Sequence, residues 1–421
     1  MINWRRYIIY SFFKKNIIFL LFLYDLRKYN IIFTFHYLTI FLKMIFNKLN
    51  FTCSVVLAFI INSSANAQNE PIGSDGKQIN SIQTAMPFLS IGPDARSGAM
   101  GDVGVAISPD ANSIHWNPSK LAFMEKPVGF SFSYTPWVRN IIKDVDLTYL
   151  SGYYRLDERN TVGASLRYFS LGTIIFTQDG KNETPYSPNE FAFDATFSRK
   201  FGEDFSLGTA VRYIRSSLAN GVILANGATV EPASALAADI SGYYKKGTMM
   251  FGKNADLALG FNISNIGTKV KYSNSDASPK SFLPTNMKLG AATTLNVDDL
   301  SKFTVALDIN KLLVPTSPLS DSSVPSAIFG SFSDAPGGFS EEMREISYAL
   351  GTEYLYNQQF ALRAGFFYED PTKGNRQYFT LGAGLRYNVF NLDLAYLLAS
   401  QQKSPLANTL RFTLAFNFAK K

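Results

Sequence analysis

Apolar and polar residues alternate with a period of two along most of the chain after residue 127. In the last such segment, LRFTLAFNF, the alternating apolar positions are Leu410, Phe412, Leu414, Phe416 and Phe418. Arg411 and Thr413 lie between them. Because successive side chains of a β-strand point to opposite faces, this pattern predicts a strand with one apolar and one polar face.

The same pattern recurs about fourteen times. The segments are 128–134, 145–154 and 161–171, followed by segments that begin at 191, 205, 235, 256, 286, 303, 346, 360, 378, 391 and 410. The connections alternate in length, since those at 155–159, 200–204 and 357–359 are short whereas those at 172–190 and 311–345 are long. Short turns at one end and long loops at the other are typical of outer-membrane β-barrels, whose turns face the periplasm. The sequence therefore predicts an all-β transmembrane barrel of about 14 antiparallel strands over 128–421, with both mature termini periplasmic.

The start of the chain has a different character. From Met44 it has a short basic region, an apolar stretch over 55–60 and an alanine-rich end, which is the layout of a signal peptide at 44–67 cleaved before Gln68. Pairs of basic residues interrupt the apolar run of residues 1–43. We therefore predict that translation starts at Met44 and that 1–43 are an upstream extension. The alternative is a genuine extended leader or anchor.

Removing residues 1–67 changes the charge balance. The whole chain has 40 basic and 33 acidic residues, and 32 of each remain after Ala67, so the net charge of +7 lies in the leader and gives no reason to expect nucleic-acid binding. The only cysteine, Cys53, lies in the signal peptide, which excludes a disulfide framework or a thiol nucleophile in the mature chain. The sequence predicts no cofactor and no metal site.

Ionisable residues occupy the polar face of the predicted strands. They are Arg167, Asp194, Arg212, Asp239, Asp308, Glu353, Arg363, Arg386, Asp393 and Arg411. Inside a barrel, equal numbers of arginines and carboxylates predict a paired network that fills the lumen, because an unpaired charge is costly at low dielectric. A polar pathway through the barrel is the alternative.

The residues before the first strand predict a plug. We assign 68–86 to a periplasmic segment and 87–127, rich in small residues and turn formers, to a plug inside the barrel that carries the motif Trp116, Asn117, Pro118. Its glycines at 98, 101 and 104 have the wrong spacing for a phosphate-binding loop. His115, the sole mature histidine, is predicted to be a packed plug residue rather than a catalytic one.

Two stretches carry a resemblance to a known family. IGPDARSGAMGDVGVAISPDANSIHWNPSKLAF and the following FSFSYTPWVRNIIKDVDLTYLSGYYRLDERNTVGASLRYFSLGTI resemble the PorV family, the outer-membrane barrels of the type IX secretion system. More loosely, the plug with its Asn117-Pro118 element resembles FadL-type transporters, which are 14-stranded barrels with an N-terminal hatch. The first resemblance implies a non-enzymatic carrier that docks at the translocon barrel and receives secreted proteins by their C-terminal signal domains. It then delivers them to a sortase-like surface peptidase for attachment to lipopolysaccharide.

Protein capture needs apolar residues in the long loops. The candidate partner-contact residues are Trp137, Ile141, Ile142, Leu312, Leu313, Ile328, Phe329, Phe332 and Phe339. Their alternative role is to fold back and seal the barrel mouth. A FadL-like transporter of hydrophobic molecules is the alternative function, and it predicts an apolar pocket beneath the plug and a kinked strand, for which LGAGL at 381–385 is a candidate. A lipid-modifying hydrolase is a third hypothesis, for which His115 is the best candidate base.

Overall fold

The computed structural model describes residues 81–139, 142–178, 182–219, 229–275, 279–316, 321–399 and 406–419. The predicted upstream extension, the signal peptide, residues 68–80 and Ile141 lie outside the described residues. Within the described part of the chain, no helix combines the length and the apolar character needed to cross a membrane.

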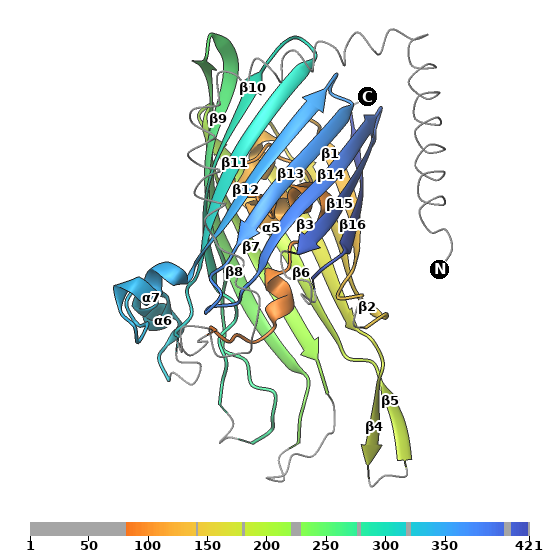
Figure 1. Cartoon of the computed structure of the whole chain (residues 1–421), viewed down its shortest axis with the longest axis vertical. Coiled ribbons are helices and arrows are strands. Elements are labelled where there is room, and N and C mark those ends of the chain that lie inside the picture. The colour runs from red at the N-terminus through yellow and green to blue at the C-terminus, as the bar shows by residue number, and fades with distance from the viewer. Residues whose placement is uncertain are drawn as a thin grey trace, which may run out of the picture. The chain divides into compact units, whose positions relative to one another are not determined.

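The described chain forms a closed antiparallel barrel of fourteen strands, which confirms the predicted fold. The barrel strands are β1 (Val128–Pro136), β2 (Val145–Arg155), β3 (Asn160–Leu171), β6 (Asn189–Phe201), β7 (Phe205–Ser217), β8 (Ala233–Met250), β9 (Lys253–Gly267), β10 (Asn286–Asn296), β11 (Ser301–Leu312), β12 (Ile346–Tyr356), β13 (Phe360–Tyr368), β14 (Gln377–Tyr387), β15 (Phe390–Ala399) and β16 (Thr409–Phe418). Each strand pairs with its neighbours along the chain, and β1 pairs with β16 to close the wall, with Val128 opposite Phe418. A separate hairpin, β4 (Ile174–Gln178) and β5 (Asn182–Tyr186), extends from the connection between β3 and β6 (Figure 1).

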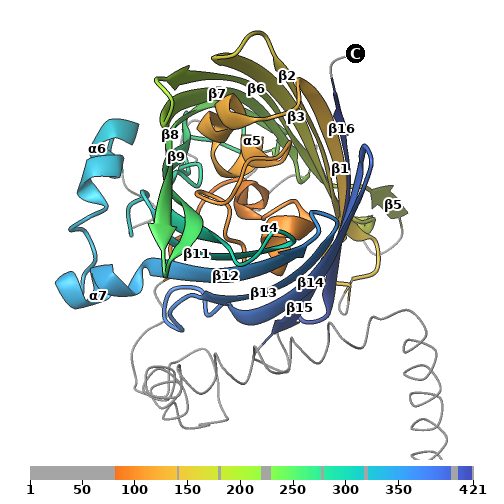
Figure 2. The ribbon, with the colours of Figure 1, turned by 90° about the horizontal axis from the view of Figure 1, so that it is seen from above.

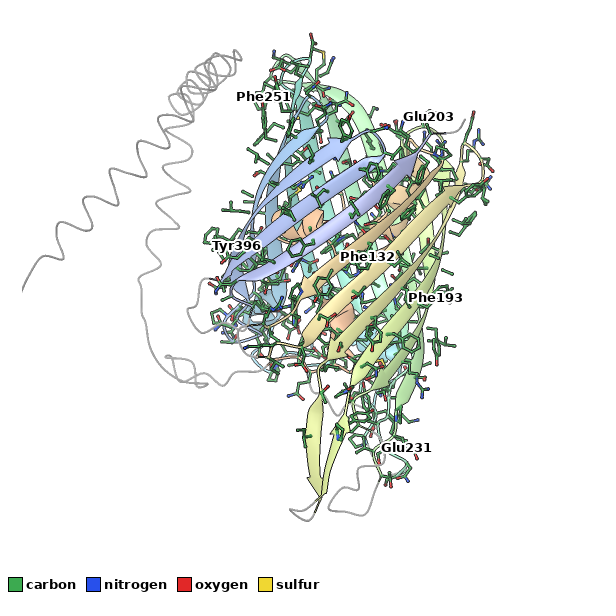
Figure 3. The ribbon with its side chains drawn as sticks, turned by 90° about the vertical axis from the view of Figure 1, so that its right-hand side faces the viewer. Phe132, Phe193, Glu203, Glu231, Phe251 and Tyr396 are labelled. Carbon is green, nitrogen blue, oxygen red and sulfur yellow. The ribbon has the colours of Figure 1, made fainter. Side chains whose placement is uncertain are left out.

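The two faces of the wall differ as the alternation predicts. On the outside, Phe132, Phe193 and Leu414 have exposed side chains, and Figure 3 shows the first two on the outer surface of the barrel. Ser133 and Thr413 face the interior and are buried. In a membrane the outer apolar side chains contact lipid, and this contact explains why the outer face of β16 is apolar.

Short and long connections lie at opposite ends of the barrel. One end, the short-turn rim, carries the turns at 156–159, 202–204, 251–252, 297–300, 357–359 and 388–389. The other, the long-loop rim, carries the connections at 137–144, 172–188, 218–232, 268–285, 313–345, 369–376 and 400–408. The longest of these forms two short helices, α6 (Val324–Gly330) and α7 (Phe339–Arg344), which lie beside the barrel rather than over its mouth (Figure 2).

The segment before β1 fills the lumen. Its elements are η1 (Pro87–Ser90), α4 (Ala95–Ala99), α5 (Ser113–Trp116) and η2 (Pro118–Phe123), and Figure 2 shows the segment enclosed by the strands. Buried side chains occur along its whole length, from Phe88 to Leu121. We call residues 85–124 the plug.

The plug runs in one direction, from the long-loop rim to the short-turn rim. Its first residues, Met86 and Phe88, pack among residues at the long-loop ends of the strands, such as Val145 and Ala233. Its last, Leu121 and Met124, pack with Tyr153 near the short-turn rim. Residues 81–86, the described part of the segment 68–86 that was predicted to be periplasmic, lie at the long-loop rim. Strand alternation carried no information about where the plug enters the barrel.

Candidate functional site

Ion pairs connect the plug to the barrel wall, and Glu353 of β12 is the centre of the largest chain. Arg363 of β13 donates to Glu353 at 2.7 Å and to Asp393 of β15 at 2.6 Å. From the plug, Arg96 donates to both oxygens of Glu353 at 3.2 Å and pairs with Asp110 at 3.0 Å. The sequence interpretation expected the network but missed Arg96. The sequence feature that could have identified Arg96 is its position as a lone arginine among small residues, in a segment predicted to lie inside the barrel.

A second chain is centred on Arg212 of β7. Its guanidinium bonds Asp194 of β6, Asp239 of β8 and the side-chain oxygen of Asn265 in β9, the Asp239 contact being 3.0 Å long. Asn265 has a left-handed backbone conformation, with φ of 61°, and its N–H donates to Asp239 at 2.8 Å. The β8–β9 register shifts at this point, between Ala238 and Ile240. The bulge therefore places the Asn265 side-chain amide beside Arg212, in addition to the two carboxylates.

Two of the predicted network residues bind the plug backbone instead of each other. Asp308 of β11 accepts the N–H groups of Gly104 and Val105 at 2.7 and 3.0 Å. Arg167 of β3 donates to the carbonyls of residues 88 and 89 at 3.2 and 2.8 Å. The expectation that arginines and carboxylates of the wall balance one another is therefore too simple, because the wall also supplies charges that satisfy plug amides and carbonyls.

The remaining two arginines differ from each other. Arg411 of β16 bonds the carboxylate of Asp102, which also accepts the hydroxyl of Tyr378 at 2.5 Å. Burial raises the pKa of Asp102, but the Arg411 guanidinium outweighs that effect and leaves the pKa below its usual range. Arg386 is half buried and has no ion pair with any described residue. It therefore lies inward without taking part in the network.

The plug motif serves as a packing and capping element. The Trp116 indole N–H donates to Asp94 at 2.6 Å, and the Asn117 amide donates to the carbonyls of Val105 and Gly242 at 2.9 and 3.1 Å. The Asn117 side-chain oxygen caps η2 by accepting the N–H of Ser119. Pro118 occupies the first turn of η2, where its missing N–H costs nothing.

Asp94 and Lys120 of the plug are also buried and have shifted pKa values. Burial, strengthened by the charge of Asp110, raises the pKa of Asp94 to about 6. Burial lowers the pKa of Lys120, whose ammonium donates to the Gly104 carbonyl at 2.7 Å, to about 8. The plug therefore holds titratable groups whose charge is disfavoured by their surroundings.

The glycines of the plug permit close approach to other parts of the molecule. A Cβ on Gly104 would lie 2.2 Å from the Trp116 ring, and one on Gly98 would lie 2.5 Å from the Arg411 guanidinium. Gly101 has φ of +72° and lies against the backbone of Phe366. These contacts give the glycines a packing role.

His115 is enclosed in the plug and 8% exposed. A guanidinium N–H of Arg167 lies 2.5 Å from Nδ1, so Nδ1 accepts and the ring proton resides on Nε2. Burial, with the charges of Arg167 and Lys288 adding to it, lowers the pKa of His115 well below its usual range. The imidazole is therefore a neutral, packed group whose accepting nitrogen is already occupied.

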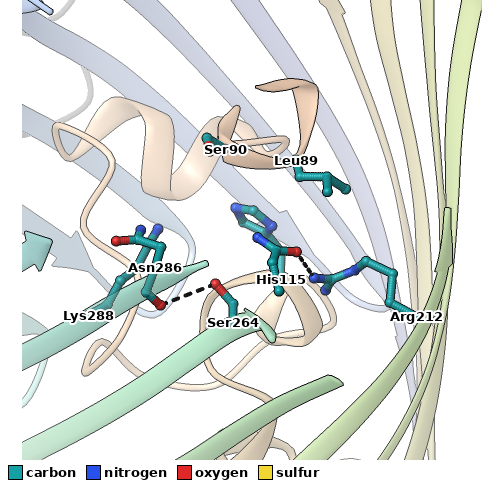
Figure 4. A pocket seen from close by; sticks show the side chains of 8 residues that line it. Leu89, Ser90, His115, Arg212, Ser264, Asn286 and Lys288 are labelled. Atoms are coloured by element: carbon teal, nitrogen blue, oxygen red, sulfur yellow. Dashed lines mark hydrogen bonds between the residues drawn. The ribbon is translucent and has the colours of Figure 1, made fainter. Parts of the chain in front are cut away.

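A small cavity, with room for about one water molecule, lies between the plug and the wall. It is lined by Leu89, Ser90, His115, Arg212, Ser264, Asn265, Asn286 and Lys288, most of whose side chains Figure 4 shows around it. The lining is polar and carries two cationic side chains. It is therefore not the apolar pocket that a transporter of hydrophobic molecules would need.

The glycines of LGAGL do not kink β14. The strand keeps an unbroken register with β13 and β15. A Cβ on Gly382 would lie 2.3 Å from that of Ala99 in the plug, and one on Gly384 would lie 2.5 Å from Asp393. These positions make room for the plug and for the Arg363–Asp393 ion pair.

The connection between β11 and β12 forms a built structure outside the lumen, which we call the appendage (residues 321–345). Two buried lysines hold it. Lys311, in β11, donates to Glu342 at 3.0 Å and to Glu345 at 2.6 Å, and Lys373, in the connection after β13, donates to Glu341 at 2.6 Å and to Glu345 at 3.0 Å. The appendage is therefore fixed to two separate parts of the rim.

Carboxylate oxygens of Asp334, Glu342 and Glu345 lie within 4.8 Å of one another. Three clustered carboxylates can hold a cation, but Lys311 and Lys373 already pair with two of the three acids. Burial raises the pKa of Asp334, which accepts the N–H of Thr316 at 3.2 Å. The protein thus supplies its own counter-charges at this position.

The predicted partner-contact residues divide into two groups. Leu313 is buried, and Trp137 packs against the cluster at the barrel mouth, whereas Leu312 and Ile328 are half buried. The exposed members, with their exposed fractions, are Ile142 at 45%, Phe329 at 78%, Phe332 at 48% and Phe339 at 80%. Met343, which the sequence interpretation did not select, is 44% exposed. Buried and exposed members of the set therefore occur within the same loops.

Similar barrels occur among solved structures. They include the Ralstonia pickettii toluene transporter TbuX, at 12% identity over 78% of this chain and 98% of the other with a TM-score of 0.44. The Pseudomonas putida toluene transporter TodX has 12% identity over 78% and 99% with a TM-score of 0.47, and a Pseudomonas aeruginosa FadL homologue has 11% over 80% and 99% with a TM-score of 0.44. These identities are too low for the ligands of those proteins to be carried over. No curated protein sequence matches the chain.

The family model described as type IX secretion system protein PorV matches residues 74–319, which include the whole plug and the wall from β1 to β11. This match extends over more than half of the chain. The chain therefore belongs to the PorV family and is an outer-membrane component of the type IX secretion system.

Proposed function

We propose that this barrel is a non-enzymatic carrier for protein secretion. It receives exported proteins by their C-terminal signal domains at the translocon barrel and delivers them to a sortase-like peptidase on the cell surface, in a membrane rich in lipopolysaccharide. Family membership supports the secretion role, and the steps of receipt and delivery are what the family resemblance implies.

The observation that carries the proposal is that the lumen is filled while an exposed aromatic surface lies outside it. The plug is buried along its length and bonded to β12 and to β3, on opposite sides of the barrel, so a folded protein domain has no passage through the lumen. A capture surface must then lie at a rim. The appendage presents Phe329, Phe332 and Phe339 to solvent.

Exposed aromatic side chains favour a protein-binding role for the appendage. Aromatic residues dominate the energetics of protein interfaces, and a soluble surface rarely leaves several together without a partner. The ion pairs of Lys311 and Lys373 fix α7, which carries Phe339, so binding at that side chain loses little conformational entropy.

Two alternatives have less support. The transporter hypothesis needs an apolar pocket and a kinked strand, whereas the described cavity is polar and β14 is regular. The hydrolase hypothesis depends on His115, whose accepting nitrogen is bonded to Arg167. Lipid A that stays unchanged in a His115→Ala strain is the result expected for a carrier.

The proposal is tested with the triple variant Phe329→Ser, Phe332→Ser, Phe339→Ser. Cargo at the cell surface should fall at least about tenfold, which corresponds to 1.4 kcal/mol of lost binding, and cargo should accumulate in the periplasm. Cargo and translocon recovered with a tagged barrel should fall in parallel. Phe251→Ser, at an equally exposed phenylalanine of the short-turn rim, is the matched control and should leave secretion unchanged.

Normal secretion by the triple variant, with the barrel present at its usual level in the outer membrane, would show that the appendage is not the capture surface. Recovery of the tagged barrel with bound fatty acid and without secretion proteins would favour transport instead.

A further inference from the structure

The hairpin of β8 and β9 extends beyond its neighbours at the short-turn rim. Its two strands pair with each other as far as Met250 and Lys253, and a turn of Phe251 and Gly252 joins them. Both turn residues have positive φ, 53° and 71°, as in the tight turns that two-residue hairpins favour. Figure 3 shows Phe251 at the same end of the barrel as Glu203. The extension is therefore a regular β-hairpin.

One edge of this hairpin has no partner strand. On the β7 side, the pairing ends with Phe205 opposite Tyr244, and a last bond runs from the N–H of Lys245 to the carbonyl of Asp204 at 2.8 Å. Past that bond, no described residue pairs with the side of residues 246–250 that faces away from β9. We call this free side, which is about 15 Å long, the hairpin edge.

The bond of Lys245 also shows which backbone groups the hairpin edge presents. Because the N–H groups of a strand alternate between its two sides, those of Gly247 and Met249 point in the same direction as that of Lys245, away from β9. A free row of such groups is a template for another strand, and folded proteins usually block it with a proline, a bulge or a covering segment. Residues 246–250 contain no proline, and their register with β9 is unbroken.

The side chains around the hairpin edge determine which kind of strand it suits. Lys246 and Lys253 are exposed, whereas Lys245 pairs with Asp256 at 3.2 Å, so the extension has an excess of positive charge. Met249 is 68% exposed. A segment with acidic and apolar side chains complements both features, whereas a second copy of the hairpin brings like charges together.

We propose that the hairpin edge binds an extended, acidic segment of a periplasmic protein as an added β-strand. The backbone of Gly247 and Met249 supplies the hydrogen bonds, and the lysines select for acidic side chains. The short turns of outer-membrane barrels face the periplasm. The outward phenylalanines of β6 and β7 end at Phe201 and Phe205, so the edge lies beyond the apolar wall and in water. This binding is separate from cargo capture at the long-loop rim and does not depend on it.

Proline at an edge position tests the contribution of the backbone. Met249→Pro removes an N–H that points away from β9 and therefore spares the pairing within the hairpin. Met249→Ala, the matched control, removes the side chain but keeps the N–H. The probe is a short fluorescein-labelled peptide of alternating valine and glutamate, and a valine–lysine peptide is its control. Fluorescence anisotropy measures the binding of each peptide to the whole barrel, purified in detergent.

The natural protein and Met249→Ala should bind the valine–glutamate peptide. Met249→Pro should bind it at least about tenfold more weakly, because a hydrogen bond is lost and the proline ring obstructs the added strand. The heat-modified migration of the barrel should be unchanged, and Gly247→Pro repeats the test at the other edge N–H should Met249→Pro fail to fold.

Equal binding by the natural protein and the folded proline variants overturns the proposal. So does the absence of binding by the natural protein, or equal binding of the valine–lysine peptide. Dimers of the natural protein that are lost in Met249→Pro would make a second copy the occupant of the edge, which also overturns the proposal. Cargo secretion is not a readout of this test, so its outcome is independent of the proposed carrier function.

Discussion

The carboxylate of Asp102 accepts hydrogen bonds from both terminal nitrogens of the Arg411 guanidinium, across a sequence separation of 309 residues. Asp102 belongs to the plug and Arg411 to the final strand. The same strand receives a second plug contact, since the N–H of Ala95 donates to the Thr413 hydroxyl at 2.8 Å, and that hydroxyl lies 2.8 Å from Ser133 of β1. The plug therefore bonds directly to the seam where the first and last strands close the barrel.

We predict that Arg411→Met destabilises the barrel by about 3–5 kcal/mol, because it leaves the buried Asp102 carboxylate without its counter-ion. The midpoint of urea unfolding in detergent, followed by heat-modified migration on a gel, measures the loss. Asp102→Asn in the same protein should restore part of it. A double variant no more stable than Arg411→Met alone would contradict the assignment of the loss to this pair.

The control for that prediction is Lys200→Met. Lys200 pairs with Glu203 at 3.1 Å on the short-turn rim, but the Glu203 side chain is 93% exposed, and Figure 3 shows it there. Solvent screens such pairs, so little or no change in stability is expected.

Close packing of the plug against β13 leads to a second prediction. A Cβ on Gly365 would lie 2.1 Å from the backbone nitrogen of Gly101. Because the contact is with backbone, the plug or the strand must shift, and we expect Gly365→Ala to destabilise the barrel by about 1–3 kcal/mol or more. Gly247→Ala, where the nearest atom is 4.0 Å away, should be neutral in the same unfolding assay. Equal stability of the two variants would mean that the plug is loosely held.

Alternation of residues was sufficient to predict the wall. The strand expected from 410 begins at Thr409, and the one expected from 286 begins at Asn286, because one face of each strand must meet lipid and a shift by one residue would turn polar groups outward. The hairpin of β4 and β5 was expected only as a long loop. It is short and stands apart from the barrel, so no lipid-facing constraint marks it in the sequence.

The arrangement inside the barrel was only partly predictable. Strand parity placed Asp308 and Arg167 inward correctly, but it contained no information on whether their partners would be side chains or plug backbone. The direction of the plug and the position of the appendage depend on contacts such as Ala85 with Phe282 and Lys373 with Glu341. These contacts join residues that are far apart in the sequence and lie in segments without periodicity.

The pKa of Asp94 gives a prediction about pH. Its pKa in the folded chain, about 6, exceeds its ordinary value of 3.8, so the folded chain binds more protons than the unfolded chain between these values. The stabilisation is complete below pH 3.8 and is lost as the pH rises through 6. We expect the difference in unfolding free energy between the natural protein and Asp94→Asn to favour the natural protein more at pH 4.5 than at pH 7.5. A difference that does not change with pH would show that Asp94 is not titrating in this range.

The appendage provides the last prediction. Lys311 and Lys373 are buried, and their ammonium groups contact Glu341, Glu342 and Glu345. Replacing both lysines with methionine leaves these carboxylates close together without counter-charges, so α7 should detach from the rim while the barrel stays closed. Chymotrypsin added to intact cells should then cut at Phe339 several times faster, with the heat-modified migration of the barrel unchanged. The Lys302→Met variant, changed at an exposed position of β11 near the opposite rim, should be cut at the natural rate. If the double variant also keeps the natural rate, the lysines do not hold the appendage in place, and the fixed aromatic surface proposed for cargo capture loses its main physical support.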